Sequence, residues 1–384
     1  MVVMKHYPAP AKPEPFRPTW AEISTRTLTR NISSIQKYVN KQAGLLIVVK
    51  ANAYGHGAAA CAVTALNAGA RYLGVSSIEE GIQLREQGIT GPILILGSQY
   101  PFEHFSAVAD YRLTPTVASL TAAKALAQAG TRKRLRIPFH FKIDTGMGRI
   151  GVNPTSACEI IKNIVSYEYI YAEGVYTHLA CAESNAAYTK HQLNLFDRVR
   201  AELNRAGIII PLYHAANSSA AIRFKRSHYS MVRIGLSAYG LQTSGTHKFR
   251  GLRPVLSWKT KIVFLKTVPA GTSISYCGTY KTRKKTQIAT LPVGYADGYN
   301  RLLSNNAEVI IRHVRCPVIG RVTMDMIMVD VTRVKKCAIG DEVILIGGSG
   351  KEFITAEELA TQCRTINYEI VCRIADRVPR IIRA

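Results

Sequence analysis

A lysine stands at the end of an uninterrupted apolar run near the start of the chain. Residues 44–49, "GLLIVV", contain no polar side chain, and Lys50 follows them directly, ahead of the turn "ANAYGHG". Burial disfavours a charged ammonium group, so an amine in this position becomes usable as a nucleophile or a base. A lysine after a strand is more often a surface group, but the apolar run and the glycine-rich turn favour a desolvated, reactive Lys50. His56 in the same turn has no required chemical role, and we expect it to be a packing residue or a supporting group behind the site.

Further polar residues follow later apolar runs in the same way. They are Lys142, Asp144 and Arg149 in "KIDTGMGR", Tyr176 and His178 in "YTHLA", His214, Asn217 and Ser218 in "HAANSS", and Arg233, Gly235 and Leu236 in "VRIGL". Each has a plain structural interpretation as well: a lone histidine is often a core residue, and "NSS" before a helix is a typical N-cap. Their common position after the apolar runs favours a shared site.

Two of these segments suggest particular ligands. The serine of "NSS" and the backbone of "IGL" suit a phosphate, and the guanidinium of Arg149 suits a carboxylate. A lysine able to form a Schiff base, a phosphate cradle and an arginine for a carboxylate together describe pyridoxal phosphate chemistry on an amino acid. The residues alone leave racemisation, decarboxylation and elimination open.

The elements that must position these residues follow a repeated pattern. Eight apolar, strand-like runs lie at residues 45–50, 72–77, 92–98, 112–119, 138–144, 171–180, 209–218 and 230–240. Segments of helical periodicity lie between them at 31–42, 76–88, 119–130, 156–165 and 189–207. Eight such units favour an α/β fold of the closed (β/α)8 TIM-barrel type, whose active site lies at the C-terminal strand ends. An open parallel sheet is the alternative, because the third and fourth units are weakly patterned.

The pattern changes after about residue 250. Alternating segments at 256–268, 284–294, 307–322, 326–334 and 341–349 are separated by turns, and only residues 355–363 have helical periodicity. This pattern indicates a second, mainly antiparallel β domain. We therefore predict a cofactor-binding barrel over residues 1–250 and a C-terminal β domain over residues 251–384.

Composition restricts the partners. The 384 residues include 50 Lys and Arg against 25 Asp and Glu, a formal net charge of +25. The densest basic stretches, 131–136 and 281–285, lie far apart and carry no interleaved aromatic residues. We therefore expect no nucleic-acid partner, and attraction of anionic small molecules is a simpler use of the charge. The eight cysteines show no metal-ligand spacing and are expected to be reduced, mostly buried thiols.

The location is also constrained. No apolar run approaches the length that spans a bilayer, so we expect no membrane partner. The first 20 residues are rich in proline and lack a hydrophobic signal core. We expect a cytoplasmic protein rather than a secreted one.

Nine motifs, in order along the chain, resemble the alanine racemase family of pyridoxal-phosphate enzymes. They are "VVKANAYGHG", "KIDTGMGRIGV", "YTHLACAES", "HAANSSA", "MVRIGLSAYG", "ISYCGTY", "LPVGYADGYNR", "GRVTMDM" and "INYEI", and the match extends from residue 17 to residue 383. The resemblance implies a (β/α)8 barrel followed by a β domain that takes its first strand from about residues 17–27. It also implies a head-to-tail homodimer with shared active sites, and interconversion of L- and D-alanine to supply D-alanine for peptidoglycan.

The resemblance assigns two acid–base groups. Lys50 would carry the cofactor as a Schiff base and serve as one group, and Tyr276, supplied by a second subunit, would serve as the other. Inverting a stereocentre without moving the substrate needs a proton acceptor on one face and a donor on the other. A phenol in water has a pKa of about 10, so the family pattern links Tyr276 to His178 and, through it, to Arg233.

Arg233 would face the pyridine nitrogen of the cofactor. Arginine does not readily release a proton, so this nitrogen would stay unprotonated. The cofactor is then a weaker electron sink, which disfavours side reactions such as transamination.

The resemblance also implies roles for the remaining residues. The phosphate would be held by Tyr54, Ser218, the amides of Gly235 and Leu236, and Tyr368, with His178 and Asn217 among the other cofactor contacts. Arg149 and the Met324 amide would bind the substrate carboxylate; Tyr295, Arg301 and Asp325 would shape the entrance, and His214 would support the site. Lys142 occupies a position that many family members carbamylate, giving an anion that orients Arg149.

Three other classes of protein share part of this pattern. A related decarboxylase of basic amino acids would be expected to place an acidic group where this chain has Arg233. A single-barrel cofactor-homeostasis protein would lack the β domain and a counterpart of Tyr276. A broader-specificity racemase acting on serine, lysine or arginine is closer in mechanism, and is the alternative to an alanine racemase.

Overall fold

The computed structural model describes residues 16–242 and 249–384, which divide into two compact units. One unit comprises residues 23–255 with 382–384, and the other comprises the described part of residues 1–22 with 256–381. The first 15 residues, most of the proline-rich segment, lie outside the described residues. None of the helices in the described ranges is both long and apolar enough to cross a membrane.

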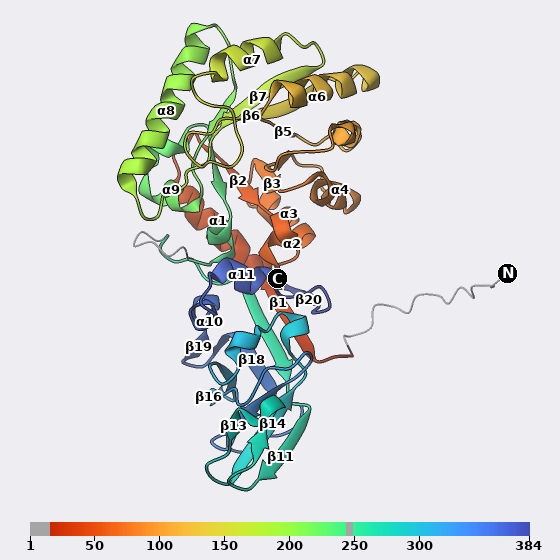
Figure 1. The fold of residues 1–384 in the computed structure, drawn as a ribbon, viewed down its shortest axis with the longest axis vertical. Coiled ribbons are helices and arrows are strands. Elements are labelled where there is room, and N and C mark those ends of the chain that lie inside the picture. Colours follow the sequence, from red (N-terminus) through yellow and green to blue (C-terminus); the bar gives the residue numbers. More distant parts are fainter. Residues whose placement is uncertain (1–15, 243–248) are drawn as a thin grey trace, which may run out of the picture. The chain divides into compact units, whose positions relative to one another are not determined.

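The larger unit contains eight parallel strands (Figure 1). They are β2 (Gly44–Val48), β3 (Tyr72–Val75), β4 (Ile93–Ile95), β5 (Thr116–Val117), β6 (Ile137–Lys142), β7 (Ile170–Tyr176), β8 (Leu212–His214) and β9 (Met231–Ile234). They pair in the orders β4–β3–β2–β9 and β5–β6–β7–β8. Backbone hydrogen bonds join the two sets, from Ile95 N to Thr114 O (2.8 Å) and from Ser230 N to Tyr213 O (3.0 Å). The strands therefore close into a barrel, which confirms the predicted fold and excludes the open sheet.

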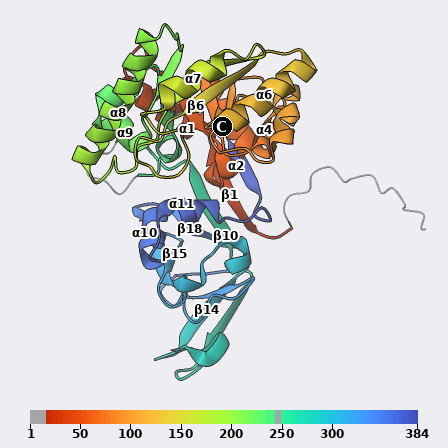
Figure 2. The ribbon, with the colours of Figure 1, turned by 45° about the horizontal axis from the view of Figure 1, so that its top comes forward.

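Helices follow the barrel strands and lie outside them (Figure 2). They are α2 (Lys50–Tyr54), α3 (Ala58–Asn67), α4 (Ile78–Glu86), α5 (Phe105–Asp110), α6 (Leu120–Lys133), α7 (Ala157–Val165), α8 (Ala186–Arg205) and α9 (Ser218–Arg223), with α1 (Thr25–Tyr38) before the first strand. The five helices expected from periodicity are present. The side chains of Ser24, Ser77 and Ser119 cap α1, α4 and α6. Helix α3 was missed because its sequence, "AAACAVTALN", has little polar contrast between its faces.

The smaller unit is built mainly from antiparallel strand pairs. Its main sheet has the order β16 (Val314–Pro317), β15 (Glu308–Ile311), β18 (Glu342–Ser349), β10 (Leu256–Lys261), β1 (Thr19–Ser24) and β20 (Arg380–Arg383), with β19 (Glu352–Ile354) paired to β18. A second sheet joins β11 (Phe264–Val268), β14 (Thr286–Leu291) and β17 (Ile327–Asp330), and β12 (Ser273–Ile274) forms a hairpin with β13 (Tyr280–Lys281). The mainly antiparallel β domain is therefore confirmed.

Two expectations for the chain need correction. The β domain contains α10 (Ala356–Gln362), as expected, but also α11 (Asn367–Cys372), a six-residue helix too short to show a period. All eight cysteines are free, but only Cys61, Cys316 and Cys363 are buried. Cys277 and Cys372 are exposed because they lie in a short turn and at the end of α11.

Candidate active site

Lys50 opens a left-handed turn at the C-terminal end of β2. The four residues after it, Ala51, Asn52, Ala53 and Tyr54, have φ angles of 51°, 51°, 55° and 53°. None of them is glycine, so the turn costs roughly 1–2 kcal/mol for each residue. Such strain persists only where the surrounding structure determines the conformation. One brace is the Ala51 amide, which donates to Oε1 of Glu80 (2.7 Å).

His56 is the second brace of this turn. Its Nδ1 lies 3.0 Å from the carbonyl oxygen of Ala53 and 2.9 Å from that of Tyr54. Because carbonyl oxygens only accept, the hydrogen must be on Nδ1 and is shared between them. The ring is fully buried, 4.6 Å from the ring of Tyr239. Sequence reasoning expected His56 to be a packing residue or a supporting group behind the site; its hydrogen bonds help to fix the backbone between Lys50 and Tyr54.

Four residues predicted to bind phosphate lie after β2, β8 and β9: Tyr54, Ser218, Gly235 and Leu236. The Gly235 amide donates to Oγ of Ser218 (3.2 Å). A Cβ atom at Gly235 would lie 2.6 Å from the hydroxyl of Tyr54, so only glycine lets this hydroxyl lie against the backbone. Leu236 follows at the start of a short 3₁₀ turn, and Asn217 caps α9 by accepting from the Ala220 amide (2.9 Å). Hydroxyls and amides gathered in this way fit an anionic group.

Lys142 is buried at the end of β6. Its Nζ lies 5.0 Å from the centre of the Tyr176 ring, and Cζ of Arg233 lies 5.2 Å from the same ring. Burial, followed by the charges of Arg233 and Arg149, lowers the pKa of Lys142 to about 7. A substantial fraction of this amine is therefore neutral near pH 7. Sequence reasoning placed Tyr176 at the barrel rim but gave it no role, whereas its ring lies next to both basic groups.

The turn that presents Arg149 is fixed by a carboxylate. Asp144 accepts from the amides of Gly146 (2.9 Å), Met147 (2.7 Å), Gly148 (3.1 Å) and Arg149 (3.2 Å). Partial burial raises the pKa of Asp144, but these four donors outweigh burial and hold it below its ordinary value. Asp144 is therefore a brace of the turn, and the Arg149 side chain is exposed.

Arg233 is buried at the end of β9. Its guanidinium donates to Nδ1 of His214 (2.8 Å), to the carbonyl oxygens of Thr177 (2.8 Å) and Ala215 (2.9 Å), and to Nδ1 of His178 (3.3 Å). Burial lowers the pKa of Arg233 to about 10. Burial and the charge of Arg233 hold the pKa values of His178 and His214 well below the ordinary histidine value, so both rings are neutral near pH 7.

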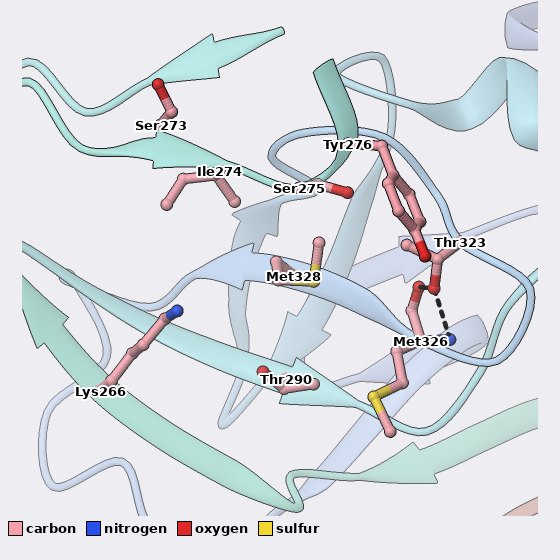
Figure 3. A pocket seen from close by; sticks show the side chains of 9 residues that line it. All are labelled: Lys266, Ser273, Ile274, Ser275, Tyr276, Thr290, Thr323, Met326 and Met328. Atoms are coloured by element: carbon pink, nitrogen blue, oxygen red, sulfur yellow. Dashed lines mark hydrogen bonds between the residues drawn. The ribbon is translucent and has the colours of Figure 1, made fainter. Parts of the chain in front are cut away.

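Tyr276 lies in the β domain, in a 3₁₀ turn that follows β12. Its side chain is 70% exposed. The preceding residue, Ser275, has a φ of 63°, and its hydroxyl donates to the carbonyl oxygen of Arg321 (2.7 Å). Tyr276 borders a pocket of about 420 Å³ together with Thr323 and Met326 (Figure 3). The turn is therefore held in place while the phenol ring projects outward.

Met324 lies in a tight turn next to this pocket. The turn is closed by the Thr323 amide, which donates to the Met326 carbonyl oxygen (3.0 Å). The amides of Tyr295 and Ala296 donate to the carbonyl oxygens of Thr323 and Met324, each at 3.0 Å. The Met324 amide itself donates no hydrogen bond within residues 16–242 and 249–384. It is available to a ligand.

Asp297 links the Met324 turn to two arginines that lie far apart in the sequence, Arg17 and Arg377. It is fully buried and accepts from Gly294 N (2.8 Å), from Nε of Arg377 (2.8 Å) and, through both oxygens, from Arg17. Arg377 also pairs with Asp325 (2.8 Å) in the Met324 turn. Burial raises the pKa of Asp297, but the two arginines outweigh it and hold the pKa below its ordinary value. Arg17 and Arg377 lie 360 positions apart in the sequence, so no local signal indicated their role.

The predicted site residues thus fall into two groups. The barrel unit carries Lys50, Tyr54, Lys142, Arg149, His178, His214, Asn217, Ser218, Arg233, Gly235 and Leu236. The β domain carries Tyr276, Met324, Asp325, Tyr368 on α11, and Tyr295 and Arg301, which line a second surface pocket with Arg373. Their individual chemical roles stay predictions.

A barrel with a lysine after its first strand and an anion cradle after its last two, followed by a β domain, defines a pyridoxal-phosphate amino-acid enzyme. The chain belongs to the alanine racemase family: residues 23–243 match the family model "Alanine racemase, N-terminal domain" and residues 255–382 match "Alanine racemase, C-terminal domain". The family resemblance found in the sequence is therefore confirmed.

Similar proteins cover nearly the whole chain. The alanine racemase of Halothermothrix orenii is 45% identical over 366 residues, which are 95% of this chain and 96% of that protein. The structure of alanine racemase from Clostridium difficile 630 has a TM-score of 0.92 at 38% identity and covers 96% of this chain and 97% of its own. The structure of alanine racemase from Bartonella henselae with covalently bound pyridoxal phosphate has a TM-score of 0.84 at 29% identity. It covers 95% of this chain and 99% of its own.

Proposed function

We propose that this protein interconverts L- and D-alanine with pyridoxal phosphate and supplies D-alanine for peptidoglycan in the cytoplasm. Membership of the alanine racemase family supports this function. The observation that carries it is Arg233, a buried guanidinium whose hydrogen bonds fix it at the barrel end. A group that only donates hydrogen bonds suits a racemase, because it does not protonate the cofactor ring and so disfavours competing reactions.

The barrel residues fit the cofactor. The cradle formed by Tyr54, Ser218 and Gly235, in which a Cβ would collide, suits its phosphate, together with the Leu236 amide and Tyr368. The Lys50 amine would hold its aldehyde carbon. Bound in this way, pyridoxal phosphate supplies an electron sink that makes the α-hydrogen of alanine acidic.

Two groups would handle the α-proton. The Lys50 amine takes or returns the proton on one face of the substrate, and the Tyr276 hydroxyl does so on the other. The 70% exposure of Tyr276 on a firmly held turn supports its use by a second copy of the chain. The active protein is then a homodimer in which each barrel receives Tyr276 from the β domain of its partner.

The substrate carboxylate would be held by Arg149 and by the Met324 amide. The Asp144 brace supports the first assignment, because it fixes the backbone from which Arg149 extends. The free amide in the Met324 turn supports the second, because backbone amides bind carboxylates without a charge of their own. Tyr295, Arg301 and Asp325 would limit the size of the substrate side chain.

A racemisation assay on several amino acids tests the proposal. L- and D-alanine, serine, lysine and arginine are each incubated with the cofactor-loaded protein, and the optical rotation is followed. We expect alanine to react in both directions with the highest kcat/KM. A higher kcat/KM for serine, lysine or arginine would establish the broader-specificity racemase instead. Absence of racemisation for all of them would contradict the proposed function.

A further inference from the structure

A series of polar side chains, most of them buried, leads from Arg233 near the end of β9 to Glu173 in the middle of β7. His214 Nδ1 accepts from Arg233, and His214 Nε2 lies 2.8 Å from Nδ1 of His140 on β6. His140 Nε2 lies 3.5 Å from Oε2 of Glu173 on β7, and the Tyr72 hydroxyl donates to the same oxygen (2.5 Å). Both histidines are fully buried, and the Glu173 side chain is 25% exposed. Of these side chains, the roles predicted for the site use only Arg233 and, as a supporting residue, His214.

The direction of each contact in this series follows from its two ends; the contact between His140 Nε2 and Glu173, at 3.5 Å, is an ion-pair contact rather than a hydrogen bond. A guanidinium only donates, so Nδ1 of His214 accepts, and the hydrogen of this neutral ring is on Nε2. Nε2 then donates to Nδ1 of His140, whose own hydrogen is on Nε2 and faces Glu173. A carboxylate only accepts, so every contact from Arg233 to Glu173 places a donor opposite an acceptor. Burial lowers the pKa of both His140 and His214, so each ring carries one hydrogen near pH 7.

Local backbone features place Glu173 in this chain. In the β6–β7 ladder Phe139 lies opposite Ala172, but His140 lies opposite Gly174, so Glu173 is an extra residue at a β-bulge. A bulge interrupts the regular alternation of side chains along a strand and so changes the direction in which a side chain points. A Cβ atom at Gly174 would lie 2.6 Å from Nδ1 of His140, so glycine at this position gives the ring the space it needs.

We propose that Glu173 is a positioning residue that keeps Arg233 aligned by fixing the tautomers of His140 and His214. The catalytic consequence of this inference rests on the proposed function, whereas its effect on the tautomers of His140 and His214 does not. Without an acceptor at position 173, the hydrogen of His140 can move to Nδ1 and donate to Nε2 of His214. The hydrogen of His214 must then be on Nδ1, where it meets an N–H of Arg233, and two donors face each other.

This mismatch would displace the guanidinium at the barrel end. Arg233 is then less well aligned with the ring nitrogen of the cofactor. Transamination should become faster relative to racemisation. In transamination, alanine and pyridoxal phosphate become pyruvate and pyridoxamine phosphate, so each event removes one active cofactor. If Glu173 only stabilised the fold, replacing it would change neither the histidine tautomers nor the ratio of transamination to racemisation.

The structural part is tested on the cofactor-free protein by ¹⁵N NMR of labelled histidines, which reports the tautomer of each ring. The variants are Glu173→Leu, which removes the acceptor, and Glu173→Gln, which keeps the shape but can accept or donate. The controls are Tyr72→Phe, which leaves the carboxylate in place, and Glu159→Gln, which changes an exposed charge on α7. We expect His140 and His214 to be Nε2–H in the wild type and both controls, and to gain Nδ1–H in Glu173→Leu, whereas Glu173→Gln, whose amide oxygen can still accept, should keep more of the wild-type tautomers than Glu173→Leu. Unchanged tautomers in the folded Glu173→Leu protein would overturn the proposal.

The catalytic part is tested on the cofactor-loaded protein as the number of racemisation turnovers per pyridoxamine phosphate formed. We expect this ratio to fall about tenfold in Glu173→Leu, the effect of roughly one lost hydrogen bond, and to stay near the wild-type value in both controls. An unchanged ratio in a variant with altered tautomers would overturn the link to Arg233. A wild type that does not racemise alanine would contradict the proposed function and leave the NMR result valid.

Discussion

The amine of Lys142 and the guanidinium of Arg233 lie against one aromatic ring, that of Tyr176, at 5.0 and 5.2 Å from its centre. An aromatic face attracts a cation, but two buried positive charges also repel each other. The pKa of Lys142 is accordingly lowered to about 7, first by burial and then by Arg233. This relationship makes Lys142 a barrel amine whose charge state changes near neutral pH, and it leads to the first two predictions.

The charge of Lys142 should make folding stability depend on pH. Between the folded pKa of about 7 and the ordinary value of 10.5, the unfolded chain binds a proton that the folded chain has released. The free energy of unfolding therefore rises with pH across this window, by up to about 1.4 kcal/mol per pH unit. Urea unfolding of the cofactor-free protein in bicarbonate-free buffer measures it, with Lys142→Met as the reference. We expect the Met variant to gain most over the wild type at pH 7 and to lose that advantage towards pH 10; a constant difference would contradict the shift.

The same neutral amine should react with carbon dioxide. Its nitrogen bonds to the carbon of CO₂ and releases a proton, giving a carbamate anion that can pair with Arg149. We expect a carbamate signal in ¹³C NMR with labelled bicarbonate, increasing above pH 7 and absent in Lys142→Met. An unmodified Lys142 amine at saturating bicarbonate would rule this out.

Replacing Gly235 should weaken cofactor binding. In Gly235→Ala the new Cβ would lie 2.6 Å from the Tyr54 hydroxyl, which must move out of the phosphate cradle. We expect the dissociation constant for pyridoxal phosphate to rise about 10- to 100-fold, as for the loss of one or two hydrogen bonds to a charged group. Equilibrium dialysis measures it. Ser219→Ala is the control, because Ser219 bonds to Glu183 rather than to the cradle, and equal losses in both variants would refute this account.

His56 should stabilise the left-handed turn after Lys50. His56→Phe keeps a ring against Tyr239 but removes the Nδ1–H donor that the carbonyl oxygens of Ala53 and Tyr54 share; the backbone amide of residue 56 still donates to Ala53. We expect the free energy of unfolding to fall by about 1 kcal/mol, the net contribution of one hydrogen bond. Urea unfolding of the cofactor-free protein measures this change. His191→Phe on the exposed face of α8 should have little effect, and a similarly small effect of His56→Phe would show that the turn does not need this brace.

The convergence of residues at the barrel end was predictable, because each follows an apolar run and parallel strands of a closed barrel end on one side. Lys50, Ser218, Arg233 and Gly235 were found in this way. The left-handed turn was not predictable, since Ala51 and Ala53 carry no signal for a positive φ angle.

The chain from Arg233 to Glu173 was also hidden from the sequence. Its members come from β3, β6, β7, β8 and β9, and Glu173 joins it only through a bulge that shifts the β6–β7 register. Regular alternation along β7 would have directed this side chain to the other face. Asp297 with Arg17 and Arg377 is a similar case, because distant segments form one ion-pair network.

The most direct test of the two-base account is racemisation by Tyr276→Phe, compared with the wild type and with Tyr280→Phe on β13 as a neighbouring control. We predict that Tyr276→Phe still binds pyridoxal phosphate, because its cradle lies in the barrel unit. We predict that its racemisation of alanine falls about 100- to 10,000-fold, as expected when a general acid–base group is lost, while Tyr280→Phe stays near the wild type. Near-full activity of Tyr276→Phe in both directions would contradict the assignment of Tyr276 as the second base.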